Sequence, residues 1–230
     1  MPVVIQRSKR YREAAKKQVI EPMAVDAAVD LLKSYDATKF DQTAELIFSL
    51  GIDAKHADQM IRGSLSLPHG VGKSKRVIAF CAEHLVAPAL AAGAIKAGGQ
   101  ELVAQIEKDN FTDFDVAVAS PDMMRFVGRL GKVLGPKGLM PSPKAGTVTA
   151  DVANAVREYS AGKIEFRNDT GGNVHTVVGK VSFEKQKLID NINAMVAHLH
   201  RLKPPTSKGA FFKKVVLKGT MTPAVYLNVQ

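Results

Sequence analysis

The sequence predicts a mixed fold with an α+β part and an α/β part. Strand-like alternation of apolar and polar residues occurs near both chain ends, whereas residues 75–130 alternate between buried strands and helices. The chain has 230 residues, of which 46% are hydrophobic, so it is long enough to bury two cores of ordinary domain size. We therefore expect two domains.

The first third of the chain predicts one helix and then two strands. An i, i+3, i+4, i+7 apolar stripe follows Pro22, which we place at the first helical position; the stripe consists of Val25, Ala28, Val29 and Leu32. Residues 44–50 and 61–67 then alternate with the period of two that is typical of strands. The segment from Pro68 to Gly72 ends the second strand.

The middle of the chain predicts a βαβ unit with a parallel sheet. Residues 77–82 and 116–119 are short apolar runs, as expected of strands that are buried on both faces. An Ala- and Gly-rich segment, 86–97, follows the first run, and residues 121–130 are expected to form a helix after the second.

The last third returns to strand-like alternation. We expect strands at 163–166, 174–181, 215–218 and 225–229. A second amphipathic helix lies between the second and third of these strands; its stripe is Leu188, Ile192, Met195, Val196 and Leu199.

The charge of the chain favours an anionic partner. Lys and Arg number 32 and Asp and Glu 22, which gives a net charge of +10. Residues 159–230 carry 11 cations and 4 anions, so their net charge is +7. A basic arm occupies the first twenty residues; its cations are Arg7, Lys9, Arg10, Arg12, Lys16 and Lys17. On charge alone, a solvated basic surface is an equal alternative.

The run from Gly128 to Gly146 combines glycine, proline and lysine, where we expect a loop and neither a strand nor a long helix. Its glycines permit close backbone approach and its prolines stiffen the path. The cations in and beside the run are Arg125, Arg129, Lys132, Lys137 and Lys144. Such a loop suits a polyanion. A flexible linker is disfavoured, because apolar residues such as Leu134 stand among the glycines.

Two short motifs are weak signals for other kinds of binding. Gly72-Lys73-Ser74 matches the end of a P-loop, but Leu67 occupies the leading glycine position and a strand, rather than a helix, is expected next. A nucleotide-binding α/β enzyme is therefore the disfavoured alternative. Gly135-Pro-Lys-Gly138 matches the GXXG loop of KH domains over only four residues.

No residues indicate catalysis, a cofactor or a metal site. The single cysteine, Cys81, lies in an apolar run and is expected to be buried. His198 and His200 are two apart, so on a helix they point to different faces, and we expect both at the surface. Asp113 and Asp115 have no triad-like partner near them in sequence.

The Gly128–Gly146 run resembles the signature of the ribosomal protein L-one family, the stalk proteins of the large ribosomal subunit, and the resemblance covers nearly the whole chain. It implies a split α+β sandwich domain formed by residues 1–67 and 160–230, including the basic N-terminal arm. It also implies an inserted three-layer βαβ (Rossmann-like) domain formed by residues 68–159, with hinges near Pro68 and Tyr159-Ser160.

The resemblance places an RNA surface on the split domain. The implied RNA-binding residues are Lys39, Phe40, Asp41, Thr43, Arg167, Asp169, Gly172, His175, Lys218, Thr220 and Met221. Cations of these types meet phosphates, aromatic rings pack on sugars or bases, and hydroxyls or carboxylates bond riboses and base edges. For Phe40, burial in the core is an equal alternative. A second RNA contact loop is expected from Arg129, Lys132, Lys137 and Lys144.

Four positions depart from the family pattern. Lys218 and Gly219 stand where the family commonly has serines, and Thr222 replaces a glycine that follows the Thr-Met pair. Because a side chain replaces a bare backbone, we expect Thr222 to hinder close approach of RNA at that point. Lys218 adds a cation, whereas Thr170 removes one, since the family tends to have lysine there.

The implied function is that of a non-enzymatic constituent of the large subunit. Its implied partners are the 23S rRNA junction at the base of the mobile stalk, the deacylated tRNA that leaves the exit site, and the chain's own mRNA, whose translation it would repress. We expect a cytoplasmic protein on the ribosome, monomeric when free, with no membrane segment and no cofactor. Within the binding class, a freestanding RNA-binding regulator is the alternative.

Overall fold

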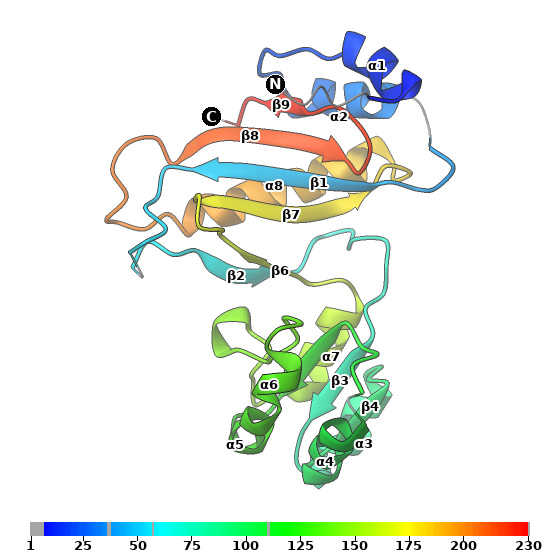
Figure 1. The fold of residues 1–230 in the computed structure, drawn as a ribbon, viewed down its shortest axis with the longest axis vertical. Coiled ribbons are helices and arrows are strands. Elements are labelled where there is room, and N and C mark those ends of the chain that lie inside the picture. Colours follow the sequence, from blue (N-terminus) through cyan, green and yellow to red (C-terminus); the bar gives the residue numbers. More distant parts are fainter. Residues whose placement is uncertain (1–6, 36–37, 57, 110, 230) are drawn as a thin grey trace, which may run out of the picture. The chain divides into compact units, whose positions relative to one another are not determined.

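The computed structural model describes residues 7–35, 38–56, 58–109 and 111–229 and divides the chain into two compact units (Figure 1). Unit 1 comprises Met1–Ile61, Leu67–Gly72 and Phe166–Gln230, and unit 2 comprises Arg62–Ser66 and Lys73–Glu165. An antiparallel sheet with helices in one unit and a parallel sheet with helices in the other confirm the predicted fold class. The first six residues of the basic arm lie outside the described residues.

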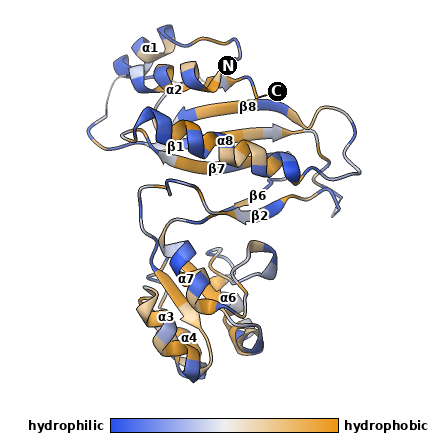
Figure 2. Cartoon of the chain, turned by 180° about the vertical axis from the view of Figure 1, so that it is seen from behind, coloured by the Kyte–Doolittle hydropathy of each residue, from blue (hydrophilic) through white to orange (hydrophobic). Residues whose placement is uncertain are grey.

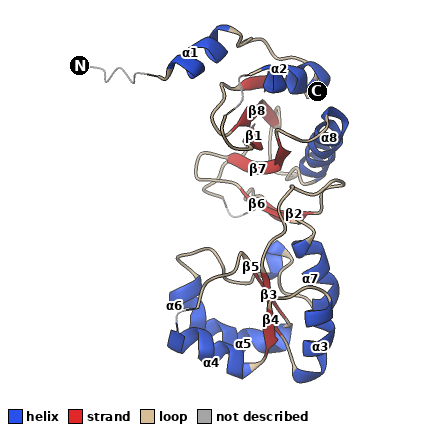
Figure 3. Cartoon of the chain, turned by 90° about the vertical axis from the view of Figure 1, so that its right-hand side faces the viewer, coloured by secondary structure: helices blue, strands red, loops and turns tan. Residues whose placement is uncertain are grey.

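Unit 1 is built on a four-stranded antiparallel sheet. The strand order is β7 (Asn173–Lys180), β1 (Thr43–Leu50), β8 (Phe212–Gly219) and β9 (Val225–Leu227). Helices α2 (Val25–Ser34) and α8 (Lys185–Arg201) pack on one face of this sheet (Figures 1 and 3). In the described part of the chain, no helix covers the other face.

The core of unit 1 lies between the sheet and the two helices. Every second residue of β1 is at most 2% exposed, from Ala44 to Leu50, and points to the helices. Helix α8 contributes Leu188, Ile192, Met195 and Leu199 at helical spacing, each 0% exposed. Figure 2 shows α8 lying across the strands, with hydrophilic residues at both of its ends.

The N-terminal part differs from the prediction. The basic arm contains a helix, α1 (Lys9–Lys16), and helix α2 begins at Val25, so Pro22 is not its first residue. Met23 instead extends the sheet edge, since its N–H donates to the Tyr226 carbonyl at 3.0 Å. Of the two histidines predicted at the surface, His200 is exposed and His198 is partly buried, with its ring edge-on to Phe166; burial lowers the pKa of the His198 imidazole.

Unit 2 is a three-layer α/β unit. Its parallel sheet has the order β4 (Lys96–Gly98), β3 (Val77–Phe80) and β5 (Val116–Ala119). Val77 and Ala79 face helices α3 (Glu83–Ala91) and α7 (Val152–Ser160), whereas Ile78 and Phe80 face α4 (Gln100–Asp109). Cys81 is fully buried in the first of these cores, as predicted.

Strands β2 (Arg62–Leu65) and β6 (Ile164–Arg167) pair in a two-stranded sheet where the chain passes between the units. The unit boundaries differ from the predicted divisions at 67/68 and 159/160. The Tyr159 side chain is 1% exposed and its hydroxyl donates to the Ala145 carbonyl at 2.7 Å, so the position predicted for a hinge, Tyr159-Ser160, is the packed C-terminal end of α7 in unit 2. Where the chain first crosses between the units, residues 67–72 belong to unit 1.

Half of the predicted basic loop is helical. The chain forms the turns η1 (Pro121–Met123), α5 (Met124–Val127), η2 (Gly128–Leu130) and α6 (Gly131–Leu134) in succession, and a final turn, η3 (Pro143–Ala145), follows later. Leu130 and Leu134 are fully buried in the core of unit 2. These apolar residues at i and i+4 were the signal for a helix, and burial outweighs the low helix propensity of the intervening glycine.

Candidate nucleic-acid interface

The helix-free face of the unit 1 sheet, here called the open face, carries a mixed polar and cationic surface. It comprises Thr43, Glu45, Ile47 and Ser49 of β1, Asn173, His175 and Val177 of β7, Lys214, Val216 and Lys218 of β8, and Tyr226 of β9. His175 stands opposite Ile47, and Lys218 stands opposite Glu45. The Lys214 ammonium lies 4.4 Å from the centre of the Tyr226 ring, which is a cation–π contact.

The turn after β8 presents Thr220 and Met221 at one end of the open face. The Thr220 hydroxyl accepts the Thr43 N–H at 3.1 Å, and the Thr220 N–H donates to the Thr43 carbonyl at 3.1 Å. The Met221 N–H donates to the side-chain carbonyl of buried Gln42 at 2.8 Å. These bonds fix the turn, while the Met221 side chain remains 50% exposed.

Thr222 does not obstruct this turn. Its side chain is 2% exposed, and its hydroxyl accepts the Gly219 N–H at 2.8 Å. The side chain therefore points inward and holds the turn closed, so the expected hindrance to close approach is wrong. Glycine at this position would lack that hydrogen bond.

Lys39 and Phe40 lie at the same end of unit 1, on the segment that enters β1. Phe40 is 52% exposed, so its burial in the core, the alternative interpretation, is wrong. A groove of about 460 Å³ lies beside it and is lined by Thr38, Lys39, Phe40, Asp41, Gln42, Val181 and Ser182. Asp41 accepts bonds from the Ser182 N–H at 3.2 Å and the Ser182 hydroxyl at 2.7 Å, so its carboxylate holds the wall of this groove.

Three other predicted residues lie at the β6–β7 turn. The Asp169 carboxylate accepts the N–H groups of Gly171 and Asn173, at 2.9 and 2.7 Å, and these bonds lower its pKa. Gly172 is buried with φ +77°, a conformation that favours glycine, so it also has a structural role. Arg167 is exposed and lines a groove of about 450 Å³ with Ala54, Met60, Asn168, Asp169 and Thr170.

The structure separates the predicted residues into two clusters. Lys39, Phe40, Thr43, Lys218, Thr220 and Met221 form the first cluster, and Arg167, Asp169 and Gly172 form the second. Strand β1 pairs with Lys180 at Thr43 and with Asn173 at Ser49, so the clusters lie at opposite ends of β7. Six residues of strand span about 20 Å. His175 lies between the clusters, on the open face.

Sequence reasoning missed three contributors to this surface. The Lys180 ammonium donates to the Thr43 hydroxyl at 3.0 Å and adds a cation to the first cluster. Gln42 positions Met221, and the Lys214–Tyr226 pair lies on the open face. The period-two alternation of β7, β8 and β9 contains the signal for which side chains share a face, but the pairing register of the strands was needed to bring them together.

The cations of the Gly128–Gly146 run lie on unit 2. Arg129, Lys132, Lys137 and Lys144 are all exposed. Lys137 donates to the Thr112 hydroxyl, whereas Arg129 and Lys132 lie on the helical turns η2 and α6. The run is thus a cationic ridge with a packed base, because Leu130 and Leu134 bury its inner side.

The other chemical alternatives gain no support. Residues after Gly72-Lys73-Ser74 lead into strand β3, so no helix N-terminus stands behind them to bind a phosphate. Asp113 and Asp115 form ion pairs with Arg76. Among the described residues, no group of three histidine, cysteine or acidic side chains could hold a metal ion. None of the described helices combines the length and hydrophobicity needed to cross a membrane.

Comparison with known proteins finds relatives that are similar over nearly the whole chain. The chain is 48% identical over 225 residues to a protein of Kosmotoga olearia, which covers 97% of both chains. It is 49% identical over 222 residues to a protein of Thermosipho melanesiensis, covering 96% of both chains. It is 50% identical over 222 residues to a protein of Thermobifida fusca, covering 96% of this chain and 94% of the relative. Each relative is named large ribosomal subunit protein uL1.

These relatives and the fold place the chain among the structural, non-enzymatic proteins of the large ribosomal subunit. Residues 32–223 match the Ribosomal protein L1p/L10e family. The chain belongs to this family, which confirms the resemblance noted in the sequence and locates the protein on the ribosome.

Proposed function

We propose that unit 1 binds 23S rRNA at the base of the mobile stalk through the first cluster and the open face. The observation that carries this proposal is the pairing of two exposed apolar side chains, Phe40 and Met221, with cations at one end of the sheet. Exposed apolar side chains that gather with cations are typical of binding sites. RNA bases and riboses provide flat surfaces on which such side chains can pack. The second cluster, about 20 Å away along β7, suits a folded RNA that lies along the strands.

Within this surface the residues divide by role. Lys39, Lys180 and Lys218 supply phosphate contacts, and Phe40 and Met221 supply apolar contacts to the RNA. Asp41 and Asp169 act through the backbone that they hold, since their carboxylates are occupied by N–H and O–H donors. In the described part of the open face, Glu45 is the one anion among the strand side chains, which keeps the surface cationic overall.

A change of Lys39 to alanine tests the proposed phosphate contact. We expect the slope of log affinity against log salt concentration to become shallower by about one unit for an in vitro transcript of the stalk junction. Filter binding over a salt series measures this slope. The matched control is Lys187→Ala, an exposed lysine of α8 on the covered side of the sheet. Equal slopes for both variants would remove Lys39 from the interface.

We further propose that the cationic ridge of unit 2 contacts deacylated tRNA during its release from the exit site. Its side chains project from a packed base, which suits a transient electrostatic contact rather than base readout. By the same logic, an mRNA fold similar to the rRNA junction would compete for unit 1, and binding there would repress translation of the chain's own message. We infer that the free protein is a cytoplasmic monomer.

Neutralising the ridge separates these two roles. With Arg129, Lys132 and Lys144 all changed to glutamine, we expect affinity for the isolated junction to change by less than about 0.5 kcal/mol, since surface changes away from a contact are small. We expect slower elongation by ribosomes that carry this variant, because a cationic contact to tRNA is lost. Elongation measured in a reconstituted translation system checks this. Wild-type speed would leave the ridge without a role in tRNA release.

A further inference from the structure

Helix α1 is a cationic element that the proposed interface does not yet include. Of its eight residues, four are cations and Glu13 is the one anion. Lys9, Arg12 and Lys16 lie at i, i+3 and i+7, so they form an exposed stripe opposite Ala14, which is 4% exposed. Glu13 lies at i+4 from Lys9 and three residues before Lys16, so it shares this exposed face and offsets part of its positive charge.

Hydrogen bonds at both ends fix this short helix in its position on unit 1. The Ser8 hydroxyl accepts the Tyr11 N–H at its N-terminus, and Lys17 donates to the Ser34 carbonyl of α2. Isolated helices of this length are unstable in water, so the N-cap and the contact with α2 hold the helix. With Ala14 as the one buried residue of α1, apolar burial contributes little to that placement.

The contacts bring α1 to the turn that carries Thr220 and Met221. The Arg10 guanidinium donates to the Met221 carbonyl at 3.4 Å, and the Gln18 amide donates to the Ala224 carbonyl at 2.8 Å. Both acceptors belong to the segment between β8 and β9. The cationic helix is therefore attached to the turn that carries the exposed Met221 side chain of the first cluster. Figure 1 shows α1 at the β9 edge of the sheet.

We propose that helix α1 is a second wall of the RNA surface, whose stripe of Lys9, Arg12 and Lys16 contacts the phosphate backbone of the RNA bound at the Thr220–Met221 turn. The proposal rests on the RNA-binding function proposed for unit 1 and assigns it a further element. When the three cations meet phosphates, counterions leave the RNA, which favours binding at low salt. Arg10 has a different role: it positions the helix on the turn.

The test is a variant in which Lys9, Arg12 and Lys16 are all changed to glutamine in the full-length protein, which leaves the Arg10 and Gln18 contacts in place. We expect the salt slope for a stalk-junction transcript to become shallower by about two units and affinity at 0.1 M salt to fall about a hundredfold, from roughly 0.7 to 0.9 unit per phosphate contact. The matched control changes Lys185, Lys187 and Arg201, three cations of α8 on the covered side of the sheet, to glutamine.

The outcomes distinguish this inference from the function on which it rests. A slope that matches that of the control variant, while the wild-type protein still prefers the junction over a random RNA duplex, overturns the role of α1 alone. A lower affinity with an unchanged slope also overturns it, because the helix would then act on the turn and not on phosphates. If the wild-type protein shows no preference for the junction, the RNA-binding function fails and this inference fails with it.

Discussion

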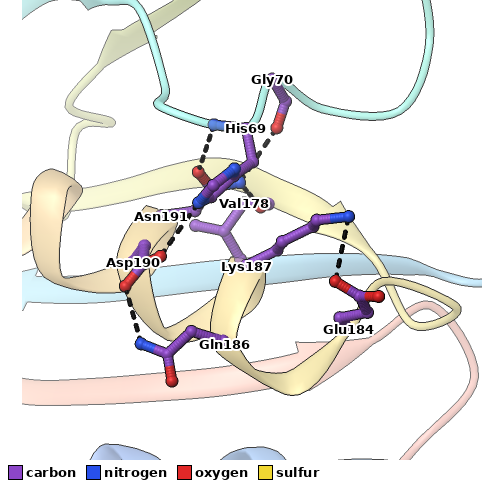
Figure 4. A network of polar contacts seen from close by, with 8 residues as sticks. All are labelled: His69, Gly70, Val178, Glu184, Gln186, Lys187, Asp190 and Asn191. Atoms are coloured by element: carbon purple, nitrogen blue, oxygen red, sulfur yellow. Dashed lines mark hydrogen bonds and ion pairs between the residues drawn. The ribbon is translucent and has the colours of Figure 1, made fainter.

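Replacing Asn191 by leucine is expected to lower the free energy of unfolding by about 3 kcal/mol, because the change leaves three backbone groups without their partner. The Asn191 side chain is 0% exposed on α8 (Figure 4). It accepts the His69 N–H at 3.1 Å and donates to the carbonyls of Gly70 and Val178, at 3.0 and 2.8 Å. Leucine has a similar volume, so the loss of these hydrogen bonds, and not a cavity, dominates the effect.

Chemical denaturation followed by circular dichroism measures the effect, and Asn193→Leu is the matched control. Asn193 is exposed on the same helix, so the same substitution there should change the free energy of unfolding by less than about 0.5 kcal/mol. Equal stability of the two variants would show that residues 67–72 do not depend on Asn191. A second readout is faster hydrogen exchange at His69 in the Asn191 variant, since its N–H would lose its acceptor.

The Asn191 contacts explain why residues 67–72 stay with unit 1 although the sequence predicted a boundary at Pro68. Proline and glycine in the segment Pro68–Gly72 indicate a turn, and the turn is present. The sequence does not show that an asparagine more than a hundred residues later fixes that turn. A polar residue in an otherwise apolar helical stripe was the available signal, since a buried amide must find partners.

The local sequence pattern predicted two elements in which burial is regular. The alternation of β1 and the stripe of α8 identified both elements, because each has one buried face. The elements that were not predicted are β4, which has three residues, and the helices α1, α4 and α7. Of these, α7 buries residues at regular helical spacing, so its pattern was available in the sequence. The division of the predicted site residues into two clusters could not be predicted. It depends on the register of β1 with β7, which no short sequence pattern contains.

The hydrogen bonds of two acidic site residues were also not predicted from the sequence. Asp41 and Asp169 were predicted to be RNA-binding residues, and in the structure both carboxylates accept hydrogen bonds from backbone or hydroxyl donors of their own unit. A short polar side chain beside glycine or serine often bonds nearby N–H groups in this way. We therefore propose that exposed cations and apolar groups make the direct contacts with RNA. For Phe40, direct contact and a structural role predict different results on substitution.

Replacing Phe40 by alanine is expected to weaken binding to the stalk junction by about 1–3 kcal/mol, which is the range for loss of one aromatic stacking contact with a base. A buried phenylalanine would instead cost about 3–5 kcal/mol of stability on truncation to alanine. Because Phe40 is 52% exposed, we expect its removal to change the free energy of unfolding by less than about 0.5 kcal/mol. The salt slope should remain that of the wild-type protein, since no charge is removed.

Filter binding and chemical denaturation on the same preparation check both expectations. Leu202→Ala serves as the control, because Leu202 is a 37% exposed apolar residue just after α8 and away from the first cluster. A Phe40 variant that binds the junction as tightly as the Leu202 variant would exclude Phe40 from the interface. A Phe40 variant that loses stability and affinity together would mean that the side chain supports the groove beside β1 and does not contact RNA. Loss of affinity at unchanged stability and unchanged salt slope is the combination that only direct contact with the RNA produces.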